Sequence, residues 1–434
     1  MTASKPNLTR RHNLEEMKIT VLDNACIFRD GKFHYGHLII AGKYIEKVGS
    51  GSFENDSGSS EEMEYHDLNG KMILPGFANT HTHSPMVVFR GLEDFAPLSK
   101  WLRKVLKREA KLNSDSVYWF TLLAQMEMAS KGITTFGDMY FHLDSMAKAV
   151  NEFGMKALLT RGLVDMDGNG RNRLMENLRE LSLSGDRVRI GLGPHAPYTC
   201  SKEYLEEISN IAKSEGVKVM IHLLESPEER EDYTLRDLVE TGIFETDLIG
   251  VHLVQVDEDD LRILKDYDVG IALCPVSNAK LWNGFPPVDR MMNMGLKLSV
   301  GTDGAASNNS LDVWKEFNYM ALVARIVNEK FDVYALFSES FENGARILGF
   351  EDTGKIEEGY RADLTIVDSG KVSYFPNVPD RLISHILFSG NSGDVFATMV
   401  DGVWIYYDGN FPTVDENEIK RNALKEFERL EGWV

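Results

Sequence analysis

The sequence MILPGFANTHTHS (residues 72–84) carries an apolar run that ends in two histidines one residue apart, His81 and His83. A short apolar run bounded by turn residues is typical of a strand that is buried on both faces. Side chains alternate along an extended strand, so His81 and His83 project to the same side. Both imidazoles can therefore reach one ion at the end of this strand.

The central part of the chain repeats the strand pattern, with amphipathic segments such as Asp115–Ala129 and Lys202–Ser214 between the runs. Eight strand–helix units over roughly 290 residues match the count and size of a (β/α)₈ TIM-type barrel. A doubly wound open sheet is the alternative, but the sequence has no glycine fingerprint for a dinucleotide. The apolar runs expected to form barrel strands are 72–78, 132–138, 155–163, 188–193, 217–224, 248–254, 269–274 and 296–301.

The two ends of the chain have a different pattern. Short alternating runs such as Ile19–Leu22 and Phe396–Val400 are typical of antiparallel strands. The predicted fold class is therefore α/β, a barrel with a small β-sandwich domain built from both termini. The predicted boundaries are 17–72 and 366–410 for the composite β domain, 73–365 for the barrel and 411–434 for a C-terminal helix, with residues 1–16 as a loose extension.

The overall charge excludes several classes of partner. The chain has 47 basic and 67 acidic residues, a formal net charge of −20, which disfavours nucleic acids and anionic membranes. No run approaches the roughly 18 apolar residues of a membrane span, and the first residues lack a signal-peptide pattern. The three cysteines are widely spaced and odd in number, which favours a reducing compartment. We therefore expect a cytoplasmic protein, and a homo-oligomer stays open.

Histidines and carboxylates recur where the predicted barrel strands end. In such barrels the chemistry takes place at the carboxyl ends of the strands. A single buried histidine is more often a satisfied core residue than a ligand, but several on one rim favour a functional site. Five of the eleven histidines stand at these ends with two carboxylates: His81, His83, His195, His222, His252, Glu225 and Asp303.

Four of these residues form the predicted metal site. His81 and His83 come from one strand, and His222 and Asp303 would reach the same ion from across the barrel. Three imidazoles and a carboxylate suit Zn²⁺ with a further position for water, while Fe²⁺ or Mn²⁺ stays open. A second metal commonly needs a bridging carboxylated lysine on strand four, where His195 stands instead. We therefore expect one divalent metal ion.

The remaining strand-end residues predict the chemistry. A divalent cation can lower the pKa of its bound water from about 16 toward 7. Asp303 can accept the proton of this water, and His252 can orient the resulting hydroxide. Glu225 can carry a proton to the substrate atom that becomes basic. This set predicts hydrolysis at an sp² carbon, as in an amide, a cyclic amide or an aromatic amidine.

These motifs resemble the amidohydrolase superfamily and, more closely, the 5′-methylthioadenosine/S-adenosylhomocysteine deaminases. The resemblance covers nearly the whole chain from Met17. It is carried by PGFANTHTHSPMVVFRGLEDFAPLSKWL (75–102), LLAQMEMASKGITTFGDMYF (122–141), ALLTRGL (157–163), GPHAPYTCSKEYL (193–205), IHLLES (221–226) and GTDGAASNNSLD (301–312).

The resemblance implies further roles at matching positions. Glu225 would protonate the ring nitrogen beside the attacked carbon of adenine. Glu109 would bind the ribose, because a carboxylate can accept from both hydroxyls. Arg161 and Arg173 would face the distal part of the nucleoside and pair with an amino-acid carboxylate. The full set of residues implied to contact substrate is Trp101, Glu109, Arg161, Arg173, His195, Glu225, Asp303 and Ser307.

Three functional hypotheses follow. The first is a metal-dependent deaminase that converts 5′-methylthioadenosine, S-adenosylhomocysteine or related 5′-substituted adenosines to inosine products and ammonia. The second is another amidohydrolase reaction on the same site, by a guanine or cytosine deaminase or a chlorotriazine or pterin hydrolase. The third is a non-catalytic scaffold, which predicts lost ligands, although none is missing. The zinc signature of nucleic-acid deaminases is absent, so the expected substrate is a small nucleoside.

Overall fold

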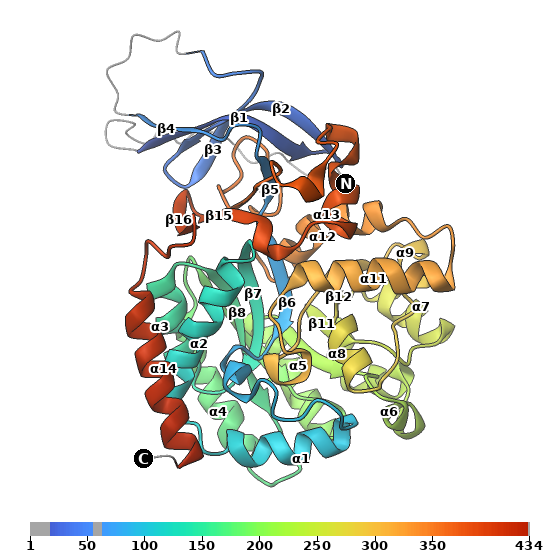
Figure 1. Ribbon diagram of the computed structural model, residues 1–434. Helices are drawn as coiled ribbons and strands as arrows, with labels where there is room; N and C mark the ends of the chain where they lie inside the picture. Colours follow the sequence, from blue (N-terminus) through green and yellow to red (C-terminus); the bar gives the residue numbers. More distant parts are fainter. Residues whose placement is uncertain (1–17, 55–62, 433–434) are drawn as a thin grey trace.

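A computed structural model describes residues 18–54 and 63–432, and the extension expected at 1–16 lies outside these ranges. Within them the chain forms two eight-stranded sheets. One sheet is parallel and consists of strands taken in sequence order, whereas the other combines strands from both ends of the chain. Figure 1 shows the parallel sheet surrounded by helices, with the second sheet at one end of it. This architecture confirms the predicted fold class.

The barrel strands are almost entirely buried, as expected of parallel strands covered on both faces. The sheet comes together between its first and last strands, where the Asp303 N–H donates to His81 O at 3.0 Å. Gly301 permits this approach, because a Cβ there would lie 2.7 Å from His81 N. The strands are β6 (Phe77–Thr82), β7 (Ile133–Tyr140), β8 (Lys156–Leu163), β9 (Val188–Pro194), β10 (Val219–Leu223), β11 (Leu248–His252), β12 (Gly270–Leu273) and β13 (Lys297–Val300).

Helices cover the barrel, and several begin at clear capping residues. Asn113 and Ser116 form a capping box at α2, and Ser201 Oγ accepts from the Tyr204 N–H at α5. Across 18–54 and 63–432, no helix has the length and apolar character needed to cross a membrane. The helices are α1 (Leu98–Glu109), α2 (Ser114–Ala129), α3 (Leu143–Phe153), α4 (Gly170–Glu180), α5 (Lys202–Glu215), α6 (Pro227–Asp232), α7 (Glu258–Asp266), α8 (Pro275–Lys280), α9 (Val288–Asn293), α10 (Ala305–Asn308), α11 (Val313–Val327), α12 (Val333–Ile347), α13 (Leu382–Phe388) and α14 (Glu416–Glu431).

The apolar run 72–78 forms two strands, although the sequence suggested one barrel strand. Met72–Pro75 is β5 of the terminal sheet, and the barrel begins at Phe77. Gly76 is the junction, where its N–H donates to Asp363 O at 2.8 Å and a Cβ would lie 2.2 Å from Thr134 Oγ1. Hydrophobicity alone does not reveal the change of sheet, because both halves of the run are buried.

The terminal sheet lies against the amino ends of the barrel strands, opposite α1 in Figure 1. Thr365 Oγ1 donates to Gly132 O at 2.6 Å, and Thr398 Oγ1 donates to Ala129 O at 2.6 Å. The carboxyl ends of the barrel strands are therefore free to carry a site. The sheet consists of β1 (Ile19–Arg29), β2 (Lys32–Ala41), β3 (Tyr44–Ser50), β4 (Met63–Asp67), β5, β14 (Leu364–Val367), β15 (Val395–Val400) and β16 (Val403–Tyr407).

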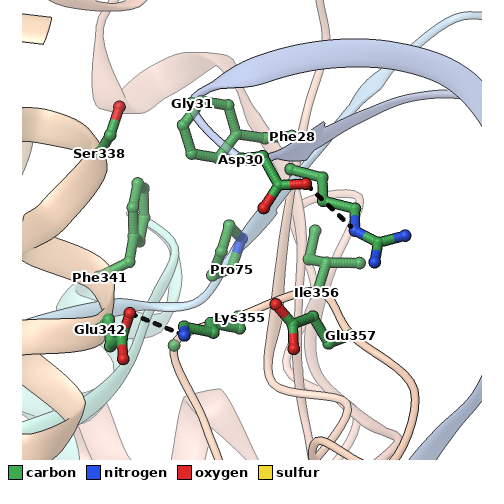
Figure 2. Close-up of a pocket in the computed structure, with 12 residues that line it drawn as sticks. Phe28, Asp30, Gly31, Pro75, Ser338, Phe341, Glu342, Lys355, Ile356 and Glu357 are labelled. Carbon is green, nitrogen blue, oxygen red and sulfur yellow. Dashed lines mark ion pairs between the residues drawn. The ribbon is translucent and has the colours of Figure 1, made fainter. Parts of the chain in front are cut away.

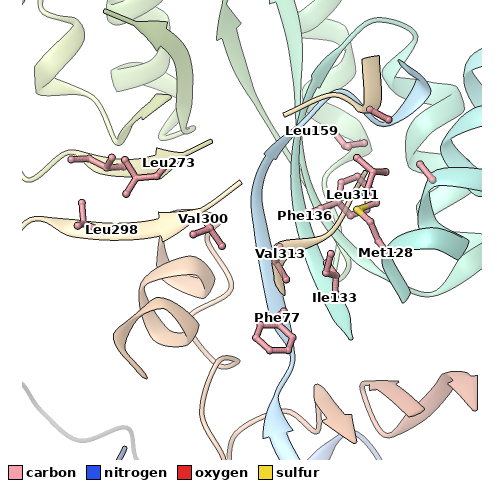
Figure 3. Packing of buried hydrophobic residues seen from close by; sticks show 14 of the residues in the cluster. Phe77, Met128, Ile133, Phe136, Leu159, Leu273, Leu298, Val300, Leu311 and Val313 are labelled. Atoms are coloured by element: carbon pink, nitrogen blue, oxygen red, sulfur yellow. The ribbon is translucent and has the colours of Figure 1, made fainter. Parts of the chain in front are cut away.

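An apolar core fixes the barrel wall on which the histidine strand runs. Phe77 at the start of β6 packs near Ile133, Phe136 and Val313, as Figure 3 shows. Its ring centroid lies 5.0 Å from that of Phe341 on α12. Burying a side chain of this size stabilises the fold by about 1.5–3 kcal/mol. This packing holds β6 in place, and with it the two histidines at its end.

A pocket of about 180 Å³ lies where the terminal sheet meets α12 (Figure 2). Phe28, Phe341 and Ile356 form its apolar side. Lys355 Nζ pairs with Glu342 Oε2 across its edge at 2.8 Å. Its lining contains no histidine, so it is separate from the predicted metal site.

Candidate metal centre and active site

The predicted metal ligands converge at the carboxyl end of the barrel. His81 Nε2 lies 3.2 Å from His222 Nε2 and 3.6 Å from Asp303 Oδ1, and His83 Nε2 lies 3.3 Å from the same Asp303 oxygen. His81, His222 and Asp303 are buried, and His83 is partly buried. The ligand atoms of His81, His83 and Asp303 all lie within 4.8 Å of one another, and those of His222 and His252 form a second such group with His81.

The outer nitrogens of these imidazoles show that lone pairs face the centre. His222 Nδ1 lies 2.6 Å from His195 O, and His83 Nδ1 lies 2.7 Å from Met139 O. A carbonyl oxygen only accepts, so each Nδ1 carries a proton, and in its neutral form each ring presents the Nε2 lone pair inward. Lone pairs and a carboxylate aimed at a common point repel one another unless a cation or a proton lies between them. The donor set therefore fits a cation.

The protonation equilibria agree with this reading. Burial lowers the pKa of His81 to about 3 and holds that of His222 well below its usual range. Burial opposes ionisation of Asp303, but its hydrogen bonds to His81 and His83 outweigh burial and keep its pKa well below the ordinary value. Burial also acts against the charged form of His83, yet Asp303 and the Met139 carbonyl raise its pKa to about 9. A metal ion would compete with that proton. The cluster is a site for a divalent metal ion.

Asp303 is held by neighbours that fix both of its oxygens. Its backbone adopts φ 59°, which turns the carboxylate back toward β6. Oδ2 accepts from Ser277 Oγ at 2.6 Å and from Ser307 Oγ at 2.7 Å, and Oδ1 accepts from the Gly304 N–H at 2.7 Å. Ser307, expected to contact substrate, thus has its hydroxyl on the Asp303 carboxylate.

His252 and Glu225 stand beside this cluster. His252 Nδ1 lies 2.9 Å from Asn278 Oδ1, and its Nε2 lies 3.6 Å from Glu225 Oε2. Burial lowers the pKa of His252 to about 4. Glu225 accepts from Asn283 Nδ2 at 2.9 Å. Burial, followed by the charges of Glu229 and Asp303, holds the pKa of Glu225 well above its usual range. The pair therefore combines an imidazole whose neutral form is favoured with a carboxyl group whose protonated form is favoured.

A cavity of about 470 Å³ opens onto these groups and is large enough for a nucleoside. The Trp101 ring lines it while its N–H donates to Ala306 O at 3.1 Å. His195 also lines it, with Nδ1 3.0 Å from Thr199 Oγ1. The predicted site residues among the lining are His83, Trp101, Glu109, Arg173, His195, His222, Glu225, His252 and Asp303.

The two predicted arginines lie in different places. Arg173 lines the cavity and forms a two-point ion pair with Asp167 at 2.7 and 2.6 Å. Arg161 is not among the lining residues and pairs with Glu180 on α4 at 2.8 and 2.7 Å. This ion pair holds the Arg161 guanidinium against α4. The structure brings Arg173 to the site but not Arg161.

Sequence reasoning missed several residues of the site. Ser277 and Asn278, which hold Asp303 and His252, come from α8, directly after β12. Tyr140 lines the cavity at the end of β7, two residues beyond the expected strand end at 138. Applying the strand-end rule to the true end of β7 would have found Tyr140.

Comparison with known sequences agrees with the site. The model of the amidohydrolase family matches residues 72–405. A 5-methylthioadenosine/S-adenosylhomocysteine deaminase of Thermotoga maritima is 41% identical, covering 93% of this chain and 98% of the relative. A 5′-deoxyadenosine deaminase of Methanocaldococcus jannaschii is 36% identical, covering 93% of this chain and 98% of the relative.

Comparison with solved structures gives the same architecture. An adenosine deaminase from Xanthomonas campestris with bound zinc is 25% identical, with a TM-score of 0.89 over 95% of this chain and 98% of that one. An atrazine chlorohydrolase from Arthrobacter aurescens with zinc has a TM-score of 0.84 over 94% of this chain and 100% of that one. At 20% identity the chlorohydrolase shares the fold alone. This chain belongs to the amidohydrolase family and, within it, to the 5-methylthioadenosine/S-adenosylhomocysteine deaminases.

Proposed function

We propose that this protein is a hydrolase that removes the 6-amino group of 5′-substituted adenosines, giving the inosine product and ammonia. The observation that carries the proposal is the convergence of His81, His83, His222 and Asp303 beside the protonated Glu225 at one end of a nucleoside-sized cavity. The names of the similar proteins support the substrate class, because they describe deaminases of methylthioadenosine, S-adenosylhomocysteine and 5′-deoxyadenosine.

We assign the metal to His81, His83, His222 and Asp303, and we favour Zn²⁺ because three imidazoles and a carboxylate suit it. Fe²⁺ or Mn²⁺ is the alternative on the same ligands. A bound cation supplies an acidified water that serves as the nucleophile at neutral pH. The remaining roles belong to side chains of the chain itself.

Three residues carry the proton transfers and the orientation of the water. Glu225 donates its proton to the ring nitrogen beside the attacked carbon, because burial raises its pKa and favours the protonated form. Asp303 accepts the proton that the attacking water loses. His252 donates to Asn278 through Nδ1, so its Nε2 is an acceptor that orients this water. Water adds at the carbon, and Asp303 passes the proton it accepted to the amino group, so that the carbon–nitrogen bond breaks and ammonia leaves. The added hydroxyl becomes the carbonyl of the inosine product and returns its proton to Glu225.

The substrate-facing residues divide the cavity into regions. We assign His195 and Trp101 to the base side and Glu109 to the ribose. Arg173 is the candidate partner for a substrate carboxylate, because a guanidinium can bind one through two hydrogen bonds. A carboxylate at the 5′ end would then compete with Asp167 for the same group. We leave Arg161 out of this assignment because it pairs with Glu180 on α4.

An activity panel tests the proposal. Metal-loaded protein should convert 5′-methylthioadenosine, S-adenosylhomocysteine or 5′-deoxyadenosine with the ultraviolet shift from adenine to hypoxanthine. Guanine, cytosine, a pterin and a chlorotriazine should react much more slowly, because they offer no ribose to Glu109. Metal analysis after growth in zinc, iron or manganese should find close to one equivalent. If no 5′-substituted adenosine is turned over by metal-loaded protein, the proposal is wrong.

We also propose the cytoplasm as the location of the protein. Cys26, Cys200 and Cys274 are all free and buried. Unpaired cysteines are typical of reducing compartments. Fractionation of the native host would test this proposal, and recovery outside the cytoplasm would contradict it.

A further inference from the structure

Tyr140 lines the cavity and carries a buried hydroxyl group that the rest of the described chain leaves without a well-formed hydrogen bond. The side chain is 4% exposed and lines the cavity at the end of β7. Its hydroxyl oxygen is buried and has no hydrogen-bond partner among the residues that the structure describes. Leaving a buried hydroxyl unpaired is costly, so such a group in a binding cavity indicates a partner that arrives with the ligand.

The position of this hydroxyl is set by rigid neighbours. The Tyr140 ring stacks on that of Phe141, with centroids 4.3 Å apart and planes 18° from parallel. Its other neighbour in the strand, Met139, holds His83 through the backbone carbonyl. Tyr140 is therefore fixed at the cavity wall beside the metal cluster, and its ring centroid lies 6.5 Å from that of His83.

Glu109 faces the same part of the cavity from the end of α1. Burial raises the pKa of Glu109, and the Tyr140 hydroxyl acts in the opposite direction. Burial also holds the pKa of Tyr140 well above its usual range, and the Glu109 charge adds to this shift. A carboxylate and a phenol therefore line the same cavity.

The chemistry of the two groups is complementary. An ionised carboxylate only accepts hydrogen bonds, whereas a phenol hydroxyl donates one and accepts others. Glu109 by itself selects only for a hydrogen-bond donor on the ligand, because an ionised carboxylate has no proton to donate. A sugar hydroxyl can donate to Glu109 and accept from Tyr140 at the same time. The pair is thus suited to a hydroxyl group rather than to a hydrogen or a methyl group at that position.

We propose that Tyr140 is a specificity-determining residue, whose hydroxyl together with Glu109 binds a ribose hydroxyl of the substrate. This inference rests on the proposed deaminase function. It adds a residue that selects for ribonucleosides over deoxynucleosides.

Kinetics with matched substrates test the proposal. Tyr140→Phe removes only the hydroxyl, and the substrates are 5′-methylthioadenosine and its 2′-deoxy and 3′-deoxy analogues. We expect kcat/KM for the ribonucleoside to fall roughly tenfold to hundredfold, mostly through KM. For the analogue that lacks the contacted hydroxyl, kcat/KM should change less than about twofold. The preference for ribose should therefore largely disappear in the variant.

Two further variants complete the design. Tyr374→Phe deletes another buried phenol hydroxyl, which donates to Asp394 at 3.2 Å next to the terminal sheet, and should leave the ribose preference unchanged. The double variant Glu109→Gln with Tyr140→Phe should lose less than the product of the two single losses, because both act on the same sugar.

Three outcomes would overturn the inference. Tyr140→Phe could lower kcat/KM equally for the ribonucleoside and both deoxy analogues, which indicates a structural role. It could also leave all of them unchanged. If Tyr140→Phe does not fold, the unaltered enzyme still decides, because equal use of ribo and deoxy substrates excludes a ribose-selecting pair. If only the role of Tyr140 is wrong, the unaltered protein still deaminates 5′-substituted adenosines. If the unaltered protein lacks that activity, both proposals are wrong.

Discussion

The two ends of the barrel each contain a buried cluster of charged side chains, but the clusters are built differently. At the amino end, Lys156 Nζ pairs with Asp363 Oδ2 at 2.5 Å and with Asp401 Oδ1 at 2.8 Å. Arg361 Nη1 and Arg187 Nε also reach Asp401, at 3.0 and 3.2 Å. At the carboxyl end, the histidines point their Nε2 atoms at one another and at Asp303.

The difference separates a structural cluster from a functional one. Every charge at the amino end meets an opposite charge, so this cluster joins the barrel to the terminal sheet. Burial opposes the charge of Asp401, but Lys156 and Arg361 outweigh it and lower its pKa. The cluster at the carboxyl end instead gathers imidazole nitrogens and a carboxylate, a donor set suited to a divalent cation. A buried group of potential metal ligands is thus a better guide to function than buried charges that already pair with one another.

Removing a proposed metal ligand from the cluster at the carboxyl end should have the largest effect, on both kcat and bound metal. Mutation of a residue that hydrogen-bonds to a metal ligand typically lowers activity by about tenfold to hundredfold. Removal of the ligand itself should cost more, so we expect His222→Ala to lower kcat by more than about hundredfold. The same variant should bind less than a tenth as much metal as the unaltered protein. Steady-state kinetics and metal analysis measure both losses. His34→Ala, an exposed histidine in β2, is the control and should change neither. Full activity without bound metal would contradict the assignment.

Breaking the cluster of charges at the amino end of the barrel should lower the stability of the fold without changing catalysis. Lys156→Met leaves two buried carboxylates without their shared cation, so we expect a loss of about 3–5 kcal/mol in the free energy of unfolding. Urea unfolding measures this loss, and kcat per folded molecule should stay unchanged. The control is Lys43→Met, whose ion pair with Asp186 is about half exposed, at 49% and 46%, and should contribute only about 0–1 kcal/mol. Equal losses in the two variants would count against the special role of the buried cluster.

Removing a residue that holds Asp303 in the cluster at the carboxyl end should have a smaller effect, on metal affinity. Ser277→Ala removes one of the two hydroxyls on Asp303 Oδ2, and we expect metal affinity to fall about tenfold to hundredfold. Competition with a chelator measures this affinity. Ser299→Ala is the matched control, because its buried hydroxyl donates to Ser340 O and not to the cluster. An unchanged metal affinity in Ser277→Ala would show that Ser307 alone holds this oxygen.

The smallest expected effect is on the pH dependence of kcat, through the ionisation of Glu225. Its acid form is needed, so kcat should fall as the pH rises through its raised pKa. Burial raises the pKa of Glu229 to about 7, and above that pH its charge disfavours ionisation of Glu225. Glu229→Gln should therefore move the alkaline limb of the kcat profile to lower pH.

Glu228→Gln is the control for this experiment, because Glu228 is exposed and water screens its charge. It should leave the alkaline limb where it is. A shift of that limb to higher pH in Glu229→Gln would show that Glu225 does not act as the acid. A similar shift in both variants would point to a general change of surface charge.

Much of the site could be predicted because a barrel strand fixes where its last residues lie. His81, His83, His222 and Asp303 each stand at or just after a strand end, and all barrel strands end on one rim. Arg161 obeys the same rule of position but points the other way, because its direction depends on the phase of β8. Tyr140 was missed because β7 runs two residues further than its hydrophobic pattern indicated.

The sequence by itself determined the repeating strands and helices, the α/β class and the candidate metal-ligating residues. These features depend on local hydrophobic periodicity and on residue types at strand ends, which are readable along the chain. Only the tertiary structure decided that the run 72–78 divides between two sheets and that Lys156 meets Asp363 and Asp401. Those contacts join residues more than 200 positions apart, and no local pattern encodes which distant charge will satisfy a buried one.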